Sequence, residues 1–160
     1  MMTDISINDN DLVMRFKKLR KVASVFIYSR NQLLLQLRDE KKGIVYPGCW
    51  GLIGGSLTNN ENPYNGIRRE IREEISITNL KKLNFIDIFL SFKIENVVHY
   101  VFRANLNATP KIILNEGIEY SFFSKSDFFK GYKISKKLKK TCFIVDHPIM
   151  KKYYFKTLQN

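Results

Sequence analysis

The chain has 160 residues and a mass of 18.8 kDa, the usual size of one domain and enough to bury a core without disulfides or structural metals. Hydrophobic residues make up 44% and charged residues 26%, a balance that excludes the disordered and membrane classes. The formal net charge of +12 favours an anionic partner such as RNA, a nucleotide or a membrane surface, although lysines that are merely solvated would give the same number.

The two cysteines, Cys49 and Cys142, are too few for a disulfide framework and lie in no zinc-like spacing. We therefore expect a reduced protein. The apolar run 22–28 follows several basic residues, but it is short for a signal-peptide core and lacks a small-residue cleavage site. Because no stretch approaches the roughly 18 apolar residues that span a bilayer, a cytoplasmic location and no membrane partner are expected.

We expect a single domain over residues 1–160, with an N-terminal extension (1–20) and a C-terminal helical segment (141–160). Apolar residues recur at helical spacing within 9–21, which predicts a short leading helix. Residues 22–28 and 32–37 are apolar and β-branched enough for strands. The polar residues between them predict a turn, so these segments should form a hairpin.

The stretch 42–55 carries Pro47 and several glycines, which predicts a loop that bends toward a site. Residues 62–75 then show the pattern of an amphipathic helix, and Pro63 suits its first turn. The apolar positions of that helix recur every fourth residue among arginines and glutamates: Ile67, Ile71 and Ile75.

The second half of the chain predicts more strands and two helices. Phe, Ile, Val and Tyr concentrate over 83–94, 97–106 and 118–123. Glu95 and Asn96 would form a tight turn between the first two strands. Ser124 or Ser126 could cap a short helix over 127–129, and a final helix over 147–158 would have Pro148 near its start.

Three carboxylates project from one face of the predicted helix 62–75. At about 100° per residue, Glu74 lies about 40° from Glu70, and Glu73 lies about 60° on the other side. Like charges at this spacing repel, so the cluster favours a bound divalent cation, for which carboxylate oxygens are natural ligands. The alternative is a solvated surface on which the same glutamates pair with the arginines of the helix.

The sequence around this helix resembles the Nudix box. Gly55, five residues, Glu61, seven residues and then Arg69-Glu70-Ile71-Arg72-Glu73-Glu74 match the family pattern, which closes here with Ile75-Ser76-Ile77. Ser76 replaces the last glycine of the pattern. Residues 33–38 and 47–51 are also similar to the family's approach to its box, and the resemblance covers residues 22–125.

The resemblance implies an α/β fold, a Nudix-like α/β/α sandwich with a mixed β-sheet. It also implies that Glu70, Glu73 and Glu74 ligate Mg²⁺, which Mn²⁺ could replace, with Glu74 as the principal ligand. The carbonyl of Gly54 or Gly55 would complete the metal site.

Other box residues are expected to have supporting roles. The resemblance implies that Arg69 pairs with Glu61 and holds the loop against the helix, and we count Arg69 among the catalytic candidates. Ile71 and Ile77 are expected to be packing positions.

The remaining candidates lie outside the metal cluster. Glu116 is the first choice for a general base and Glu119 the second, although either could be a solvated loop carboxylate. Arg38, Trp50 and Gly55 are candidates for substrate binding. Trp50 could stack on a base or, as the plainer interpretation, pack in the core.

Two histidines and a lysine run are further candidates for ligand binding. His99 has no ligand-spaced partner and is expected to be a strand histidine, while His147 could simply begin the last helix. The run 130–140 contains six lysines, which could track RNA or form a solvated face.

The predicted function is Mg²⁺-dependent hydrolysis of a phosphoanhydride bond in a nucleoside diphosphate derivative. Nucleoside triphosphates and nucleotide sugars are the leading substrates, so a small nucleotide is the expected partner. A noncatalytic nucleotide or RNA binding module and an RNA 5′-end pyrophosphohydrolase are the alternatives. Nucleic acid as a partner and a homodimer stay open.

Overall fold

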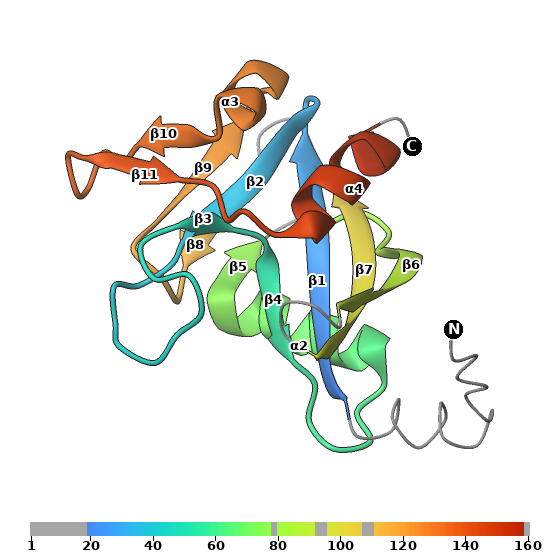
Figure 1. Ribbon diagram of the computed structural model, residues 1–160. Coiled ribbons are helices and arrows are strands. Elements are labelled where there is room, and N and C mark those ends of the chain that lie inside the picture. The colour runs from blue at the N-terminus through green and yellow to red at the C-terminus, as the bar shows by residue number, and fades with distance from the viewer. Residues whose placement is uncertain (1–18, 78–79, 92–95, 107–110, 159–160) are drawn as a thin grey trace, which may run out of the picture.

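The computed structural model describes residues 19–77, 80–91, 96–106 and 111–158. A mixed seven-stranded sheet lies at its centre (Figure 1). β1 and β7 run parallel, and the other neighbours in this sheet run antiparallel. The main path orders five strands as β3 (Trp50–Gly51), β2 (Gln32–Leu37), β1 (Arg20–Ser29), β7 (Val97–Asn105) and β6 (Asn84–Ser91), while β4 (Ile53–Ser56) pairs with β1 and β9 (Glu119–Phe123) pairs with β2.

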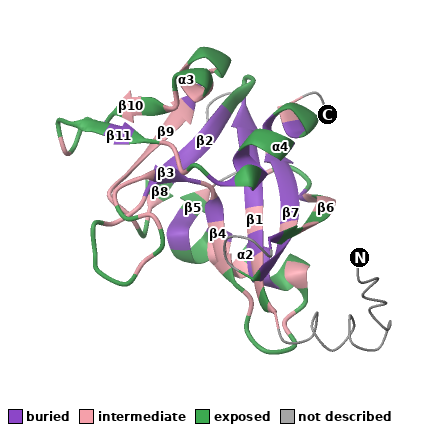
Figure 2. Ribbon diagram, viewed as in Figure 1, coloured by how far each residue is buried: buried purple, intermediate pink, exposed green. Residues whose placement is uncertain are grey.

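Helices cover both faces of the sheet. Successive side chains of a strand point to opposite sides, so each central strand contributes to an apolar cluster on either face. In β1, Val25 and Ile27 belong to the apolar cluster that includes Ile71 of α2 (Pro63–Glu74). Phe26 belongs to the opposite cluster, which includes Tyr153 of α4 (Pro148–Leu158). Figure 2 shows the central strands largely buried between these layers. The predicted α/β/α sandwich with a mixed sheet is confirmed.

The two ends of helix α2 are set by a capping side chain and by a change of backbone conformation. The Asn62 side chain accepts a hydrogen bond from the Tyr64 amide at 2.9 Å, and Pro63 occupies the first turn, where its missing N–H costs nothing. At the other end the backbone of Ile75 is extended, with φ −143° and ψ 139°. The chain passes directly into β5 (Ile75–Ile77), which pairs with β8 (Ile112–Leu114). The predicted helix is confirmed.

The predicted first hairpin is also confirmed. Arg30 and Asn31 have φ of 47° and 60°, the left-handed conformations of a two-residue turn that matches the twist of its strands. The predicted leading helix lies almost wholly outside the described residues. Its last two positions, Arg20 and Lys21, are wrong, because they belong to β1 and pair with β7.

The second half contains the predicted strands and helices, and more. Ser124 caps α3 (Lys125–Lys130) through a reciprocal pair of hydrogen bonds with Asp127, and the final helix begins at Pro148 as expected. The turn at Glu95 and Asn96 lies mostly outside the described residues. The segment 141–160 is not helical throughout, because β11 (Thr141–Phe143) pairs with β10 (Tyr132–Ile134). Among the helices that the structure describes, none is long and apolar enough to cross a membrane.

Candidate active site

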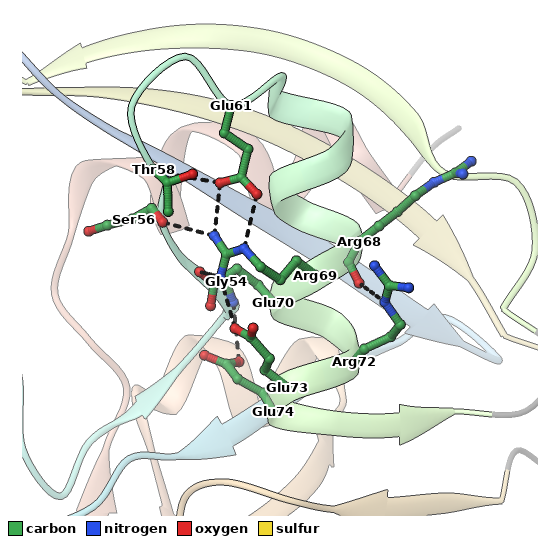
Figure 3. Close-up of polar contacts among 10 residues, drawn as sticks. All are labelled: Gly54, Ser56, Thr58, Glu61, Arg68, Arg69, Glu70, Arg72, Glu73 and Glu74. Atoms are coloured by element: carbon green, nitrogen blue, oxygen red, sulfur yellow. Dashed lines mark hydrogen bonds and ion pairs between the residues drawn. The ribbon is translucent and has the colours of Figure 1, made fainter.

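The three glutamates of α2 lie on the side of the helix that faces β4. Figure 3 shows Glu70, Glu73 and Glu74 directed toward the glycine turn, whereas Arg68 and Arg72 project from the other side of the helix. The predicted grouping of carboxylates on one face is therefore confirmed.

Glu74 is the most deeply buried of the three, with 6% of its surface exposed. Its Oε2 accepts a hydrogen bond from the amide of Gly54 at 3.2 Å. Burial raises its pKa to about 8, and the negative charges of Glu70 and Glu116 act in the same direction. A carboxylate that is both desolvated and crowded by like charge is an environment that a cation would stabilise.

Glycines are required where β4 meets this cluster. A Cβ on Gly55 would lie 2.6 Å from Oε2 of Glu70, so a side chain there would displace the carboxylate. Gly54 has φ of +141°, and a Cβ on it would lie 2.1 Å from the carbonyl oxygen of Ala23. Burial also raises the pKa of Glu70. The backbone can approach these carboxylates closely only because both positions are glycine.

Arg69 makes the predicted pair with Glu61. Its Nε and Nη2 donate to Oε1 and Oε2 of Glu61, both at 2.9 Å, and Nη2 also donates to the carbonyl of Ser56 at 3.1 Å. The Arg69 guanidinium and the amide of Thr58 lower the pKa of Glu61 to about 2. Together these bonds hold the loop after β4 against α2.

Arg69 also bonds two of the predicted metal ligands, as the alternative of glutamates paired with the arginines of the helix predicted for this residue. Its Nη1 donates to Oε1 of Glu70 and to Oε2 of Glu73, each at 2.8 Å. In the described part of the chain, no three His, Cys, Asp or Glu side chains converge closely enough to hold an ion as they stand. The cluster fits a cation in its chemistry, since Glu74 and Glu70 are desolvated carboxylates, but Arg69 competes for two of the oxygen donors.

Glu116 lies beside the cluster, and Glu119 does not. The amide of Glu116 donates to the carbonyl of Glu74 at 3.1 Å, and the Glu116 carbonyl accepts a bond from Nε2 of Gln36 at 2.9 Å. Its side chain is exposed. Glu119 instead accepts hydrogen bonds from Ser135 Oγ and from two backbone amides of the β10–β11 turn. The second choice for a base is therefore wrong, because that carboxylate organises a turn.

A match to a known protein family identifies the domain that carries this site. The sequence profile of the NUDIX domain matches residues 18–142, which covers most of the chain and all of the site described above. The chain belongs to the Nudix hydrolase family. It is thus an enzyme of the class that acts on acid anhydrides, a pyrophosphohydrolase.

Solved Nudix structures agree with this assignment. A MutT Nudix hydrolase from Burkholderia pseudomallei is 25% identical, with 68% of this chain and 84% of that chain covered and a TM-score of 0.54. A MutT protein from Methanosarcina mazei shares the fold at 19% identity, with coverages of 88% and 92% and a TM-score of 0.55. A Nudix hydrolase from Nitrosomonas europaea shares it at 23% identity and a TM-score of 0.53, with 68% of this chain covered. The chain spans 59% of that last protein. Comparison with curated proteins gives no match.

Ser76 explains how this Nudix box dispenses with its last glycine. The residue lies in β5 opposite Ile113, where extended backbone accepts any side chain. Its side chain is exposed, and the side-chain Nδ2 of Asn115 donates a hydrogen bond to the Ser76 hydroxyl oxygen at 3.1 Å. Asn115 also donates to the carbonyl of Arg72 at 3.0 Å. Here the serine helps to tie the end of α2 to the turn that carries Glu116.

A cavity of about 190 Å³ opens beside the glycine turn. Arg38 lines it together with Gly54 and Gly55, and the charge of Arg38 acts to lower the pKa of Glu74. A larger groove of about 690 Å³ lies on the other side of α2, and box glutamates line neither hollow directly. The smaller cavity adjoins the cluster through Gly54, whose amide donates to Glu74.

Trp50 does not line this cavity, and the expectation that it binds substrate is wrong. The side chain is fully buried, its ring packs edge-on against Phe123 at 5.2 Å between centroids, and its Nε1 donates to the carbonyl of Lys133. No face of the indole is accessible for stacking on a base. Its role is to join β3 to the β10–β11 hairpin.

Two histidines meet at the cavity, which the sequence analysis missed. His99 is a buried residue of β7, as expected, and its ring centroid lies 4.8 Å from that of His147. His147 begins α4 by accepting a bond from the amide of Ile149 at 3.2 Å. Burial lowers the pKa of His99 to about 4, and the charges of His147 and Arg20 add to the effect. Only the folded sheet brings these distant positions together.

Proposed function

We propose that this Nudix hydrolase cleaves a phosphoanhydride bond in a nucleoside triphosphate or a nucleotide sugar, with Mg²⁺ as cofactor. The observation that carries the proposal is the buried carboxylate of Glu74, which lies against the Gly54 amide and has its pKa raised to about 8. Burial makes the charged form of such a carboxylate unfavourable, and a hard cation bound to it would offset this cost. Phosphates add more negative charge, so one ion can stabilise both protein and substrate.

The residues that would hold the ion are Glu70, Glu73 and Glu74, with the Gly54 carbonyl as a further donor. When bound, Mg²⁺ neutralises phosphate charge and lowers the pKa of the attacking water. Mn²⁺ takes similar oxygen ligands and should substitute. Arg69 holds Glu61 through Nε and Nη2 and bonds Glu70 and Glu73 through Nη1, so the loop contact does not depend on the nitrogen that bonds these two would-be ligands.

Glu116 is the group that we assign to accept the proton of the attacking water. It is exposed, and its own amide and that of Asn115 both donate to the carbonyl of Glu74. The hydrogen bond from Gln36 fixes the backbone of that turn. A Cβ on Gly117 would lie 2.5 Å from the Gln36 side chain, so a glycine is needed for this contact. The turn therefore presents the Glu116 carboxylate at the edge of the cluster.

The cavity size limits what part of the substrate enters it. At about 190 Å³, it is smaller than the roughly 300–1,000 Å³ of pockets that enclose a whole ligand. We assign to it one moiety of the nucleotide, with the phosphates between Arg38 and the glutamates. The cationic Arg38 favours the anionic chain at this point, and its Nε is anchored by the carbonyl of Val45 at 2.8 Å.

A nucleotide panel tests the proposal. Nucleoside triphosphates and nucleotide sugars are incubated with Mg²⁺, and released phosphate, pyrophosphate and monophosphate are measured. Turnover that Glu74→Gln abolishes and Asp146→Asn retains supports it, since Asp146 is an exposed carboxylate paired with Lys151. Binding without turnover across the panel would favour the noncatalytic module instead.

A further inference from the structure

The β10–β11 hairpin has its apolar and polar faces reversed. Its outward side chains Tyr132, Ile134 and Phe143 are 42%, 65% and 63% exposed. Between them, the inward positions hold Lys133 and Cys142, which pair with each other in the register. A hairpin that only served the core would bury its aromatic residues and expose its lysine. The exposed apolar side chains therefore indicate a surface that contacts something else.

The inward side chain of Lys133 is held in place by contacts within the fold. Nζ of Lys133 donates to the carbonyl of Phe122 at 2.7 Å, reaches Asp127 at 3.5 Å and lies 4.8 Å from the ring centroid of Phe123. These contacts fix which face of the hairpin points outward. Tyr132 and Phe143 are directly opposite each other, with ring centroids 6.1 Å apart.

Lysines lie beside the two strands of this face in the sequence, before β10 and in the turn between β10 and β11. Glu119 binds the backbone amides of Lys136 and Lys137, which holds the turn between β10 and β11 in place. Among the residues that the structure describes, neither of these lysines forms an ion pair, and neither do Lys130 and Lys139. The hairpin thus combines exposed rings with lysines that form no ion pair with any described carboxylate, although the charge of Lys136 acts on Glu119 and lowers its pKa.

The hairpin leads directly into the wall of the catalytic cavity. Beyond β11, Ile144 forms a bridge with Trp50, and the amide of Val145 donates to the Trp50 carbonyl at 2.9 Å. Val145 and His147 then line the cavity beside the glycine turn. Figure 1 shows this segment crossing β3 on its way to α4. The hairpin and the cavity beside the glycine turn are therefore joined by one short segment of chain.

We propose that the face formed by Tyr132, Ile134 and Phe143, with the lysines before β10 and between β10 and β11, is a docking surface for a single-stranded nucleic acid whose 5′ phosphates enter the catalytic cavity. Exposed aromatic rings stack on bases of any sequence, and unpaired lysines follow the phosphates. A second copy of the chain fits less well, because a two-fold contact would bring two sets of lysines together. The inference rests on the proposed function only in placing the 5′ end at the glutamates.

Anisotropy of a labelled 12-nucleotide single strand tests the surface. RNA and DNA strands of one sequence, each with a 5′-triphosphate or a 5′-hydroxyl, are titrated with the full chain without Mg²⁺, so that no turnover occurs. Phe143→Ala and Tyr132→Ala should each weaken binding by about fivefold or more. Phe85→Ala is the matched control, since Phe85 is 43% exposed on β6, and its affinity should stay at the wild-type value.

The salt dependence provides a second measurement. Removing Lys136 and Lys137 together should lower the slope of log affinity against log salt by about 1.4, or about 0.7 for each phosphate contact. Lys82→Ala, an exposed lysine before β6, should leave the slope unchanged. If RNA and DNA bind alike, the surface reads the backbone and bases; tighter binding of RNA adds contacts to the 2′-hydroxyl, and both results support the proposal.

Other outcomes would overturn it. The docking surface would be ruled out if no strand bound at low salt. It would also be ruled out if Phe143→Ala and Phe85→Ala bound with equal affinity and had unchanged melting temperatures. A dimer seen by sedimentation that Phe143→Ala dissociates assigns the face to a second copy. If the hairpin variants bind strands weakly yet hydrolyse mononucleotides normally, both proposals stand. Strand binding that depends on the hairpin, without turnover of any nucleotide, would defeat the proposed function alone.

Discussion

The guanidinium of Arg69 binds Glu61 through two parallel hydrogen bonds, from Nε to Oε1 and from Nη2 to Oε2, each 2.9 Å long. This fork joins the loop after β4 to the helix that carries the metal-binding candidates. Its remaining nitrogen, Nη1, reaches Glu70 and Glu73. One arginine therefore fixes the loop and also restrains two carboxylates that the ion would need.

Arg69→Lys should reduce hydrolysis by about 10- to 100-fold, because a point charge cannot reproduce the paired bonds that position the loop. The melting temperature should fall as well. Steady-state rates and thermal unfolding measure the two effects. Arg68→Lys is the control, since Arg68 is exposed on the other side of α2. Equal losses in both variants would contradict a specific role for the fork.

Glu74→Gln should lose activity by about 100-fold or more and yet stabilise the metal-free protein at high pH. The pKa of Glu74 is about 8 in the folded chain and ordinary in the unfolded chain, so the folded state binds the extra proton between these values. The contribution of Glu74 to the stability of the wild type therefore falls as pH rises through this range. Urea unfolding at pH 9 without metal should favour Glu74→Gln by on the order of 2–4 kcal/mol.

Added Mg²⁺ should reverse that order of stabilities, because an ion that binds only the folded state stabilises the wild type. The same titration with Glu74→Gln should show little effect. A variant that is less stable than the wild type at pH 9 without metal would contradict the assignment of Glu74 as a desolvated carboxylate.

The two glycines of the turn should respond differently to alanine. Gly54→Ala puts a Cβ against the backbone of Ala23, which cannot move, so the free energy of unfolding should fall by about 2–4 kcal/mol. Gly55→Ala displaces only the Glu70 side chain, so the protein should fold while activity falls. Gly43→Ala is the control for the positive φ alone, since a Cβ there meets nothing within 4 Å. Urea unfolding and nucleotide turnover separate the three.

Sequence periodicity predicted the parts of the site that depend on local geometry. The isoleucine repeat placed Glu70 and Glu74 on one face, since helical spacing fixes side-chain direction. The resemblance to the Nudix box implied the pair of Arg69 and Glu61. Both features lie in one continuous stretch of chain, which a sequence pattern can describe.

Features that depend on tertiary packing could not be predicted in this way. Trp50 is an isolated aromatic residue beside glycines, and only the strands around it show that it is buried. The short strands β3 and β10 are too brief for a periodic pattern. His99 and His147 are separated by 48 positions, and they meet because β7 and the start of α4 border the same cavity. The lysine run 130–140 was visible in the sequence, but the contacts of Lys133 with Phe122 and of Lys140 with Glu40 were not.

His99 should make the protein less stable in mild acid. Its pKa is lowered from 6.5 to about 4 by burial and by the neighbouring charges of His147 and Arg20, so between these values the unfolded chain binds the extra proton. The contribution of His99 to the free energy of unfolding should therefore decrease as pH falls from 6.5 toward 4, by on the order of 2 kcal/mol, which is opposite in sign to the contribution of Glu74. Urea unfolding at pH 7.5 and pH 5 is therefore compared in the Glu74→Gln background, with and without His99→Gln. His99→Gln should flatten the slope in this range. If both proteins show the same slope, the buried imidazole is not the group that responds to acid.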